Sequence, residues 1–367
     1  MNGDKADSIL VFRIGQMGDA LVSLPAIRAI RKRHPDSRMV LFTDVHDGKR
    51  FTPSWEVFEP TGVFSEVLFY GPNMLLPQGW RDLWHLASRI RRLKPQRLYY
   101  LAPTPRTRWQ VWRDTFFFRA VCGIKDSRGM VATDGRVGQR DARGNPVPLT
   151  PEYLRLLRIA SDVPLATDFG LSVGDAERMK VDSLWREHRI RPGARLIAMA
   201  PGGKWPAQRW PVERYGVLAR ELLLTFSGAY LIIIGGPQDS DIAGAISGGL
   251  GDRVVNCAGR LTVLQSAEAL RRCSVYVGNN SGPMHLAAAM GTRCVAISSA
   301  RDNPGIWDPC GDGHIVLRKD VPCTGCRLRF CNERALLCLT GITVEDVFQA
   351  CSSVLATASC SVMGLEH

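Results

Sequence analysis

Three glycine-containing segments carry the residue types best suited to binding an anion and moving a proton. They span residues 15–21, 201–211 and 278–289, and each directly follows an apolar run typical of a buried strand. A strand that turns through glycines into a helix is where parallel α/β proteins bind ligands. Because the first and third segments lie more than 250 residues apart, we expect them in different domains.

The first segment places a carboxylate at the start of a predicted helix. Gly15 and Gly18 allow a tight turn and a close backbone approach, and Asp19 follows in the first helical turn. A carboxylate there could act as the general base for a hydroxyl nucleophile. An acidic residue near a helix N-terminus is equally favoured as a cap. The glycine spacing is not the dinucleotide fingerprint, so both interpretations stay open.

The third segment predicts a helix that begins at an anion site. Its free N–H groups suit a phosphate, as does the hydroxyl of Ser281 between Asn280 and Gly282. His285 lies one turn further and could donate to a phosphate or a sugar hydroxyl. The alternative for a lone histidine is a structural role.

The second segment combines cations with a rigid backbone. Lys204 and Arg209 offer positive charge to a diphosphate, and Gln208 lies between them. Three prolines and two tryptophans in residues 201–211 also fit a packed surface loop without a ligand.

Four of the chain's 11 cysteines fall within 16 residues and open with a Cys-x-x-Cys pair: Cys323, Cys326, Cys331 and Cys338. Four thiols at this spacing could hold zinc or iron tetrahedrally. Such a metal would be structural, because the cluster is distant in sequence from Asp19. The alternative is four reduced cysteines without a metal.

The composition restricts the partners. The 367-residue chain carries a net charge of +12, which favours nucleotides, phosphorylated sugars or an anionic membrane surface. No helix-turn-helix, RNA-recognition or zinc-finger pattern accompanies the charge, so we expect no nucleic acid. Because no apolar stretch is long enough to span a membrane and the N-terminus lacks a signal core, we expect a cytoplasmic protein. Peripheral association with the inner face of the inner membrane is compatible with its charge.

Alternating strand and helix patterns predict an α/β protein with two doubly wound domains, residues 1–170 and 171–364. The predicted strands are 9–14, 38–43, 67–70, 97–101, 196–200, 230–235, 253–257, 274–278 and 293–298. The predicted helices are 20–33, 80–93, 212–224, 239–247, 263–272, 282–290 and 343–356. The pattern allows the last helix to pack back on the first domain.

Taken together, the three glycine-containing segments resemble glycosyltransferase family 9, the heptosyltransferases that extend bacterial lipopolysaccharide cores. The family pattern has a Gly-Gly-Asp-x-Leu opening followed by Pro, a Pro-Gly-x loop leading to Arg/His-Trp-Pro, and Asp/Asn-Ser/Thr-Gly-x-x-His. Here these are residues 15–25, 201–211 and 280–285, in the same order. Two residues depart from the pattern: Gln208 stands where the family usually has Lys, and Asn280 where Asp is common.

The resemblance implies a GT-B fold, in which two Rossmann-like domains face a central cleft. It implies an inverting glycosyltransferase that needs no catalytic metal or other cofactor, with Asp19 as the base. The donor would be a nucleotide sugar, foremost ADP-heptose, bound by the second-domain loops, and the acceptor a glycan or glycolipid bound by the first domain. Two alternatives remain: a nucleotide-sugar epimerase of the same shape and a non-catalytic scaffold that binds glycan or membrane. The oligomeric state is not indicated.

Overall fold

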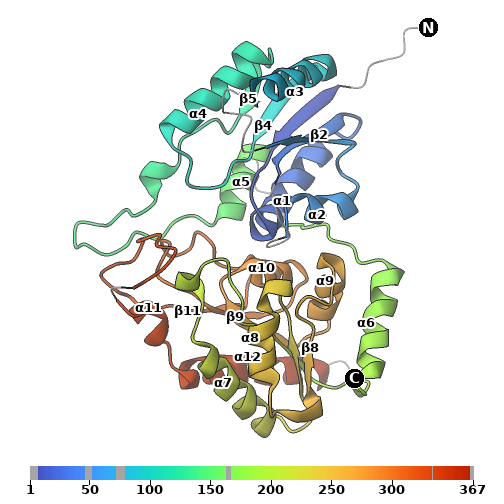
Figure 1. Ribbon diagram of the computed structural model, residues 1–367, viewed down its shortest axis with the longest axis vertical. Coiled ribbons are helices and arrows are strands. Elements are labelled where there is room, and N and C mark those ends of the chain that lie inside the picture. Colours follow the sequence, from blue (N-terminus) through green and yellow to red (C-terminus); the bar gives the residue numbers. More distant parts are fainter. Residues whose placement is uncertain (1–6, 46–51, 72–78, 163–166, 333, 364–367) are drawn as a thin grey trace. The chain divides into compact units, whose positions relative to one another are not determined.

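Two all-parallel sheets contain every strand among the residues that the computed structural model describes, namely 7–45, 52–71, 79–162, 167–332 and 334–363. The chain divides into two units (Figure 1). The first comprises Met1–Gln139 and Leu149–Ser172, and the second comprises Arg140–Pro148 and Val173–His367. The second unit therefore includes a short segment that lies within the first half of the sequence.

The first unit is built on a five-stranded sheet in the order β3-β2-β1-β4-β5. Its strands are β1 (Ser8–Phe12), β2 (Arg38–Asp44), β3 (Glu66–Tyr70), β4 (Pro95–Tyr100) and β5 (Asp126–Arg128). Its helices are α1 (Met17–Arg33), α2 (Trp55–Phe58), α3 (Trp80–Leu93), α4 (Arg108–Thr115) and α5 (Glu152–Ala160), with the π-helical η4 (Phe116–Val121) and the 3-10 turns η1 (Glu59–Thr61) and η5 (Asp134–Arg136).

Side chains of the central strands are buried on both faces of this sheet. All five residues of β1 are buried, as expected for a strand covered by helices on both sides. Leu10 and Phe12 belong to a hydrophobic cluster that also contains Leu86 of α3 and Phe118 of η4. Since successive side chains point to opposite faces, Ile9 and Val11 face the other layer. That layer contains α1, which contacts α2 and α5.

The second unit has a six-stranded sheet in the order β11-β10-β9-β6-β7-β8. Its strands are β6 (Leu196–Ala200), β7 (Tyr230–Ile233), β8 (Val254–Asn256), β9 (Val275–Asn279), β10 (Cys294–Ile297) and β11 (Ile315–Leu317). Its helices are α6 (Asp175–Glu187), α7 (Val212–Thr225), α8 (Ser240–Ser247), α9 (Val263–Arg271), α10 (Gly282–Ala289), α11 (Leu337–Thr340) and α12 (Val344–Met363), with 3-10 turns η6 (Pro206–Gln208), η7 (Pro237–Asp239) and η8 (Gly251–Arg253).

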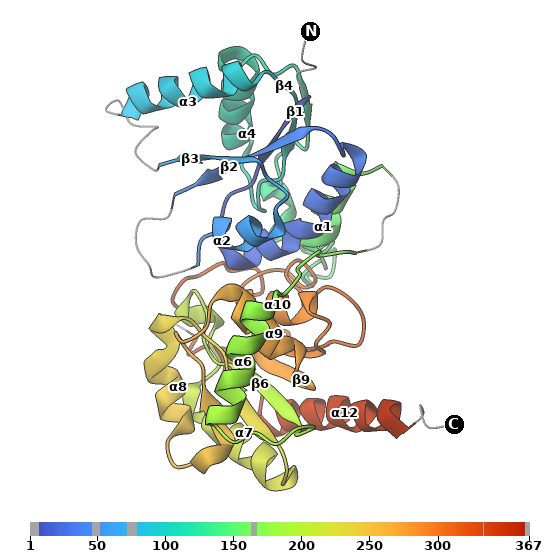
Figure 2. The same ribbon diagram turned by 90° about the vertical axis from the view of Figure 1, so that its right-hand side faces the viewer.

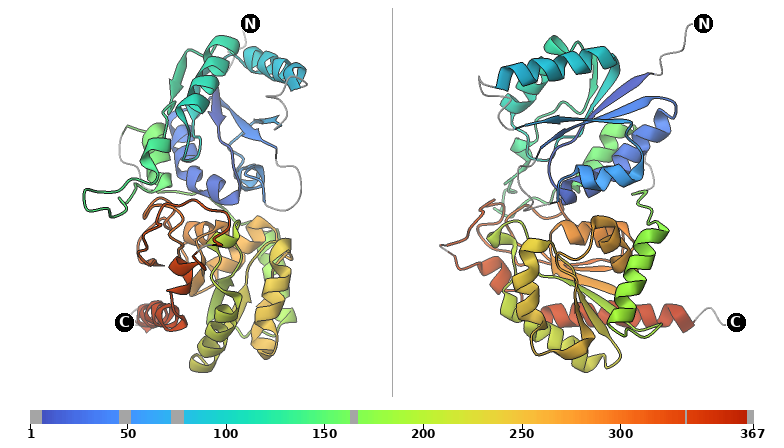
Figure 3. Two further views of the ribbon diagram at one scale, coloured as in Figure 1. Left: turned by 60° about the vertical axis from the view of Figure 1, so that its left-hand side comes forward. Right: turned by 45° about the vertical axis from the view of Figure 1, so that its right-hand side comes forward.

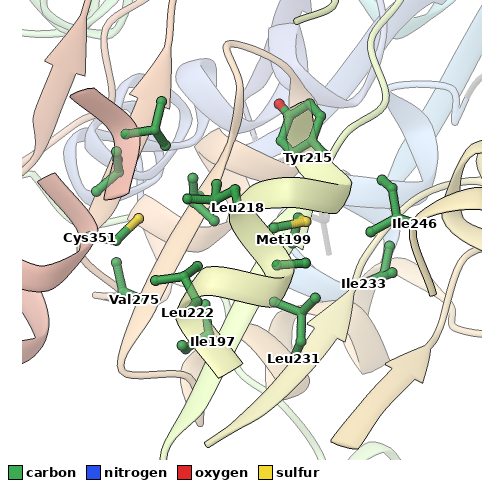
Figure 4. Packing of buried hydrophobic residues seen from close by; sticks show 14 of the residues in the cluster. Ile197, Met199, Tyr215, Leu218, Leu222, Leu231, Ile233, Ile246, Val275 and Cys351 are labelled. Carbon is green, nitrogen blue, oxygen red and sulfur yellow. The ribbon is translucent and has the colours of Figure 1, made fainter. Parts of the chain in front are cut away.

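One hydrophobic cluster joins this sheet to the helices on one of its faces. Figure 4 shows Leu218 and Leu222 of α7 packed over Ile197 of β6, with Ile246 of α8 in the same cluster. Cys351 of α12 is also part of it and is completely buried. Helix α9 contacts both α6 and α10, and these three helices form a separate group.

The last helix belongs to the second unit. Helix α12 contacts α7, β9, β10 and β11 (Figure 2). Its Val347, Val354 and Leu355 lie in the core cluster just described. Packing of this helix on the first domain, which the sequence pattern allows, stays a prediction.

The sequence predicts most elements of the two sheets closely and misses several others. Helix α3 has the predicted bounds, and β6 does too. Helices α4, α5 and α6 and strands β5 and β11 are not predicted (Figure 3). None of the helices in the described ranges combines the length and apolarity needed to traverse a bilayer.

Candidate functional site

In both sheets, the strands follow the order of a Rossmann fold. Successive strands are added first toward one edge of the sheet and then toward the other, so the order reverses at one central point. The reversal lies between β1 and β4 in the first unit and between β6 and β9 in the second. In this architecture, ligands bind outside the carboxyl ends of the strands at that point. The three predicted segments, at 15–21, 201–211 and 280–285, directly follow β1, β6 and β9.

Asp19 lies in the first turn of α1 and caps it. Its Oδ2 accepts a hydrogen bond from the N–H of Gln16 at 3.0 Å, whereas its Oδ1 lies 3.7 Å from Nη2 of Arg13. The Asp19 side chain remains 25% exposed. Gly15 has a φ of +118°, and a Cβ there would lie 2.5 Å from the Asp19 carboxylate. The structure thus confirms the cap, and it leaves this carboxylate partly accessible to a ligand.

Arg13 is a fully buried cation beside Asp19. Its Nη1 donates to the carbonyl oxygen of Leu101 at 2.7 Å, and its Nη2 donates to the carbonyl oxygen of Asp19. Because Leu101 follows β4, this guanidinium connects the two loops at the reversal point of the first sheet. Burial lowers the pKa of Arg13, whereas the Asp19 charge raises it. The sequence analysis missed Arg13, although a charged residue directly after an apolar strand was a usable signal.

Two other carboxylates, those of Asp44 and Glu152, accept hydrogen bonds from the loops that follow β1 and β4. Asp44, at the end of β2, accepts a hydrogen bond from the Gly15 N–H at 3.0 Å. Glu152 is 1% exposed and accepts hydrogen bonds from Thr104 and Arg155. Burial raises the pKa of Glu152, but its bonds to Arg155 and the surrounding charge outweigh this and hold the pKa below the ordinary value. Glu152 therefore forms a structural ion pair with Arg155, and its carboxylate is a poor proton acceptor.

In the second unit, Asn279 fixes the loop after β6. It is completely buried at the end of β9. Its Nδ2 donates to the carbonyl oxygens of Pro201 (2.6 Å) and Gly202 (3.0 Å). Its Oδ1 accepts from the Trp210 N–H (2.9 Å) and the Tyr215 hydroxyl (3.0 Å). All four hydrogen-bonding positions of the amide are used, so the predicted binding loop is anchored to the neighbouring strand.

Gln208 and Asn280 line the same small cavity. Asn280 donates from Nδ2 to the Ser298 hydroxyl (3.2 Å) and to the carbonyl oxygen of Trp307 (3.0 Å). The cavity is also lined by Arg318, whose Nη2 contacts Ser298 (3.2 Å) and Asp308 (2.6 Å). Gln208 and Asn280, which depart from the family pattern, therefore line the same cavity as the guanidinium of Arg318. The sequence analysis missed Arg318 because it follows a short strand that was not predicted.

Ser281 and His285 belong to the start of α10, for which Ser281 is the N-cap. The Ser281 hydroxyl donates to the Asn279 carbonyl oxygen at 3.1 Å. His285 is 5% exposed, and its ring lies 6.4 Å from that of Trp307. Burial lowers the pKa of His285 to about 4. At neutral pH the imidazole is therefore uncharged and can donate one hydrogen bond, but it offers no positive charge to a phosphate.

Replacing His285 with Gln is expected to reduce the acid sensitivity of folding. A histidine with an ordinary pKa of 6.5 when unfolded and about 4 when folded favours the folded state fully above pH 6.5. This contribution is lost as the pH falls from 6.5 towards 4, and its size is about 2 kcal/mol between pH 7.5 and 5.0. Urea unfolding at the two pH values measures it. An exposed histidine replaced in the same way, His85→Gln, is the control; equal pH dependence of both variants and wild type would contradict the buried neutral state.

The cations of the loop at residues 201–211 are placed differently from each other. Lys204 is exposed, and its Nζ lies 5.2 Å from the centre of the Trp205 ring. Arg209 donates from Nε to the carbonyl oxygen of Gly203 at 2.9 Å. Close by, Asp239 is 5% exposed, and burial raises its pKa. A Cβ on Gly202 would lie 2.5 Å from the Asp239 carboxylate, so the loop approaches this acid closely.

The four clustered cysteines line one cavity of about 310 Å³: Cys323, Cys326, Cys331 and Cys338. Burial raises the pKa of the Cys338 thiol, and the other three thiols raise it further. Across the described ranges, no three His, Cys, Asp or Glu side chains are placed as a metal site. Four thiols are ligands of the type that zinc and iron bind. In this structure, however, they do not form the tetrahedral arrangement expected from their spacing. This loop also contacts the predicted donor loop, since the Ala207 N–H donates to the Arg329 carbonyl oxygen at 3.1 Å.

The chain is similar to known proteins over most of its length. Residues 148–336 match the family described as glycosyltransferase family 9 (heptosyltransferase). Lipopolysaccharide heptosyltransferase 2 of Salmonella typhimurium is 30% identical over 331 residues, which are 84% of this chain and 87% of that protein. Lipooligosaccharide heptosyltransferase 2 of Haemophilus influenzae is 28% identical over 43% of this chain, and the match spans about half of that relative (46%).

Two solved structures share the fold. The E. coli ADP-heptose lps heptosyltransferase II has a TM-score of 0.66 and 19% identity, covering 96% of this chain and 99% of that one. The iron-containing dodecameric glycosyltransferase TibC of enterotoxigenic E. coli has a TM-score of 0.54 and 14% identity, covering 96% and 77%. The GT-B fold expected from the sequence is confirmed. With its ordered motifs at the reversal points of two Rossmann-like sheets and this match, the chain belongs to glycosyltransferase family 9, the heptosyltransferase family.

Proposed function

We propose that this glycosyltransferase moves a heptose from ADP-heptose to a hydroxyl of a lipopolysaccharide-type glycolipid, with inversion at the anomeric carbon. The observation that carries the proposal is the position of Asp19, partly exposed at the carboxyl end of β1 and held beside a buried arginine. The names of its relatives support heptose and lipopolysaccharide. The donor named for the E. coli structure supports ADP-heptose.

In the proposed reaction, Asp19 removes the proton of the acceptor hydroxyl as that oxygen attacks the anomeric carbon. The bond between this carbon and the diphosphate oxygen breaks on the opposite face, which inverts the configuration. The first unit would bind the acceptor, with Gly15 and Gly18 keeping the backbone close to it. A base in this position typically contributes about 100- to 10,000-fold to the rate.

The second unit would bind the donor and stabilise the leaving diphosphate. Its candidates are Lys204, Gln208, Arg209, the turn at Asn280, Ser281 and Gly282, and the imidazole of His285. Arg318 lines the cavity of Gln208 and Asn280, and we propose that it supplies the charge that the family's usual Lys would provide at 208. Asp239, at the end of η7, is a candidate acceptor for a ribose hydroxyl, because one of its buried oxygens has no hydrogen-bond partner among the described residues.

Lys204→Ala and Arg209→Ala are each expected to weaken ADP-heptose binding by roughly 1.5 to 3 kcal/mol, the range for a charge-assisted hydrogen bond. Thermal shift with ADP-, UDP-, GDP- and TDP-sugars tests which donor binds and whether the loop at residues 201–211 contributes to its binding. A donor at 100 times its dissociation constant stabilises the folded state by about 2.7 kcal/mol. The exposed Lys180→Ala on α6 is the control.

Three outcomes would contradict the proposed function. Undiminished binding by both variants would place the donor site elsewhere. Nucleotide release without an acceptor would indicate an epimerase. Nucleotide binding with no turnover on any glycolipid acceptor would indicate a scaffold.

We further propose that the four cysteines hold one structural zinc or iron ion. Their shared cavity supports this, as does the similarity of the fold to TibC, which is an iron-containing glycosyltransferase. As thiolates they would provide the four sulfur ligands of a closed site, and Arg301 and Arg334, which line the same cavity, would offset its negative charge.

Purified protein is expected to carry about one metal ion per chain, and chelation is expected to lower the melting temperature without changing the preferred donor. Elemental analysis and thermal unfolding measure the two effects. Cys326→Ser tests a ligand, and Cys122→Ser, a buried cysteine of the first unit, is the control for losing a thiol. Metal-free protein with four freely alkylated thiols would contradict the site.

The proposed glycolipid acceptor and the charge of +12 support a reaction at the cytoplasmic face of the inner membrane. We propose that the protein associates with that surface peripherally, through attraction to anionic lipid.

A further inference from the structure

A cavity lined mainly by aromatic and aliphatic side chains, with Arg113 and Asp114 as its two charged residues, lies in the first unit, apart from the residues assigned to transfer. Its volume is about 290 Å³, and ten of its twelve lining residues are apolar or aromatic. Phe12, Phe42 and Tyr70 line it at the carboxyl ends of three neighbouring strands. The rings of Phe42 and Tyr70 stack with centroids 5.2 Å apart, and the Phe12 ring lies tilted against Phe42 with centroids 5.6 Å apart. Such a wall suits a hydrocarbon ligand better than a sugar, which would need polar partners.

The cavity opens to solvent between α3 and η4. Trp80 and Trp84 of α3 and Phe116 of η4 line it, yet they are 59, 58 and 57% exposed. On α4, Trp109 and Trp112 stack with ring centroids 4.9 Å apart and are equally exposed. We call these five side chains the aromatic face. Three of them line the cavity, and Trp112 continues the set by stacking on Phe116 with ring centroids 6.2 Å apart. Such a group of large exposed aromatic residues indicates an interaction surface, because soluble proteins rarely expose them together.

The charge around the aromatic face is strongly positive. Residues 80–121 contain ten Lys or Arg and two Asp, a difference of +8, whereas the whole chain carries +12. Arg81, Arg92, Arg108 and Arg119 of this stretch are exposed. Tryptophans beside exposed arginines are typical of a surface that lies in the headgroup region of an anionic bilayer. On such a surface, tryptophan rings reach the acyl boundary while arginines meet the lipid phosphates.

We propose that the aromatic face docks on an anionic lipid bilayer and that its cavity takes one acyl chain of a bilayer lipid. The proposal deepens the proposed function, on which it rests for the glycolipid acceptor, by naming the surface that meets the membrane. Its test needs no sugar, so it can fail or succeed independently of the transfer reaction.

Vesicle co-sedimentation of the full chain tests the docking surface. Vesicles of phosphatidylcholine with a quarter phosphatidylglycerol are expected to bind the protein, and pure phosphatidylcholine vesicles far less. Trp109→Ser with Trp112→Ser should weaken binding at least about tenfold, because the interfacial rings are lost. Arg108→Gln with Arg119→Gln should weaken it about 25-fold, since each arginine near the surface contributes about fivefold.

Matched variants in the second unit are the controls. Met179→Ser with Leu224→Ser removes exposed apolar side chains, and Arg186→Gln with Arg220→Gln removes exposed charge. All variants are first compared with wild type by melting temperature and by ADP-heptose binding. Equal vesicle binding by wild type and both aromatic-face variants would overturn the docking surface.

Single-chain amphiphiles test the cavity. Dodecyl phosphate below its micelle concentration is expected to change the tryptophan fluorescence, since Trp80 and Trp84 line the cavity. Butyl phosphate should bind more than about 100-fold more weakly, because each buried methylene contributes about fourfold, and inorganic phosphate should give no change.

A variant that fills the cavity distinguishes acyl-chain binding in the cavity from bilayer docking by the surface around it. Leu83→Trp, or Val121→Trp if the first variant is unstable, is expected to weaken dodecyl phosphate binding at least about tenfold while vesicles still bind. Unchanged dodecyl phosphate binding in a folded filled variant would overturn the acyl-chain site. Vesicle binding together with no nucleotide-sugar binding would instead contradict the proposed function and leave this inference standing.

Discussion

Asp19→Asn is expected to lower sugar transfer by about 100- to 10,000-fold while donor binding stays at the wild-type level. The amide has nearly the shape of the carboxylate and keeps an oxygen that can accept the Gln16 N–H, so the cap on α1 is largely retained. What it loses is the ability to take a proton from the acceptor hydroxyl. Single-turnover transfer to a glycolipid acceptor, measured beside ADP-heptose affinity, separates the two effects.

The control is a carboxylate that caps a helix away from the proposed chemistry. Asp346 accepts a hydrogen bond from the Thr343 N–H at 3.0 Å at the start of α12, as Asp19 does at the start of α1. Asp346→Asn should alter stability slightly and leave transfer unchanged. If Asp19→Asn retained near wild-type turnover, Asp19 would be reduced to a cap.

Asn279→Ala is expected to lower the free energy of unfolding by about 3 to 5 kcal/mol, the range for a disrupted buried hydrogen-bond network. The substitution leaves four buried polar groups without a partner: the carbonyl oxygens of Pro201 and Gly202, the Trp210 N–H and the Tyr215 hydroxyl. Because these groups hold the loop at residues 201–211, donor affinity should fall as well. Urea unfolding and thermal shift with ADP-heptose measure the two losses.

Tyr215→Phe is the matched variant, because it removes one of the four hydrogen bonds and keeps the buried ring. Its expected cost is about 1 kcal/mol, with little change in donor affinity. Equal losses in the two variants would show that Asn279 acts through Tyr215 alone and does not position the loop.

The architecture and the location of the binding segments could be predicted from the sequence alone. The apolar runs at residues 9–12 and 196–200 become the central strands β1 and β6, because a run buried on both faces has few alternatives to a central parallel strand. Glycines after these runs mark the turns, so the segments carrying Asp19 and Ser281 could be placed at strand ends without coordinates. The family followed from the order of the motifs.

Helix α4 and η4 were missed, and they carry much of the aromatic face. Trp109, Trp112 and Phe116 have the i, i+3, i+7 spacing of an apolar helix face, which is a usable signal for a helix. That this face stays exposed depends on which elements pack against it, and the spacing alone does not determine that. Strand β11 has three residues and owes its conformation to pairing with β10. Arg318, which follows it, was therefore not placed near Gln208.

Which polar groups meet was settled by the packing of the folded chain. Arg13 reaches Leu101 across 88 residues of sequence, and Asn279 reaches Pro201 across 78. The neutral state of His285 likewise depends on burial by neighbours distant in the chain. Local sequence specifies strands, turns and caps because these depend on residues a few positions apart. The burial of a side chain, its pKa and its hydrogen-bond partners depend on residues that are distant in the sequence and that only the folded chain brings together.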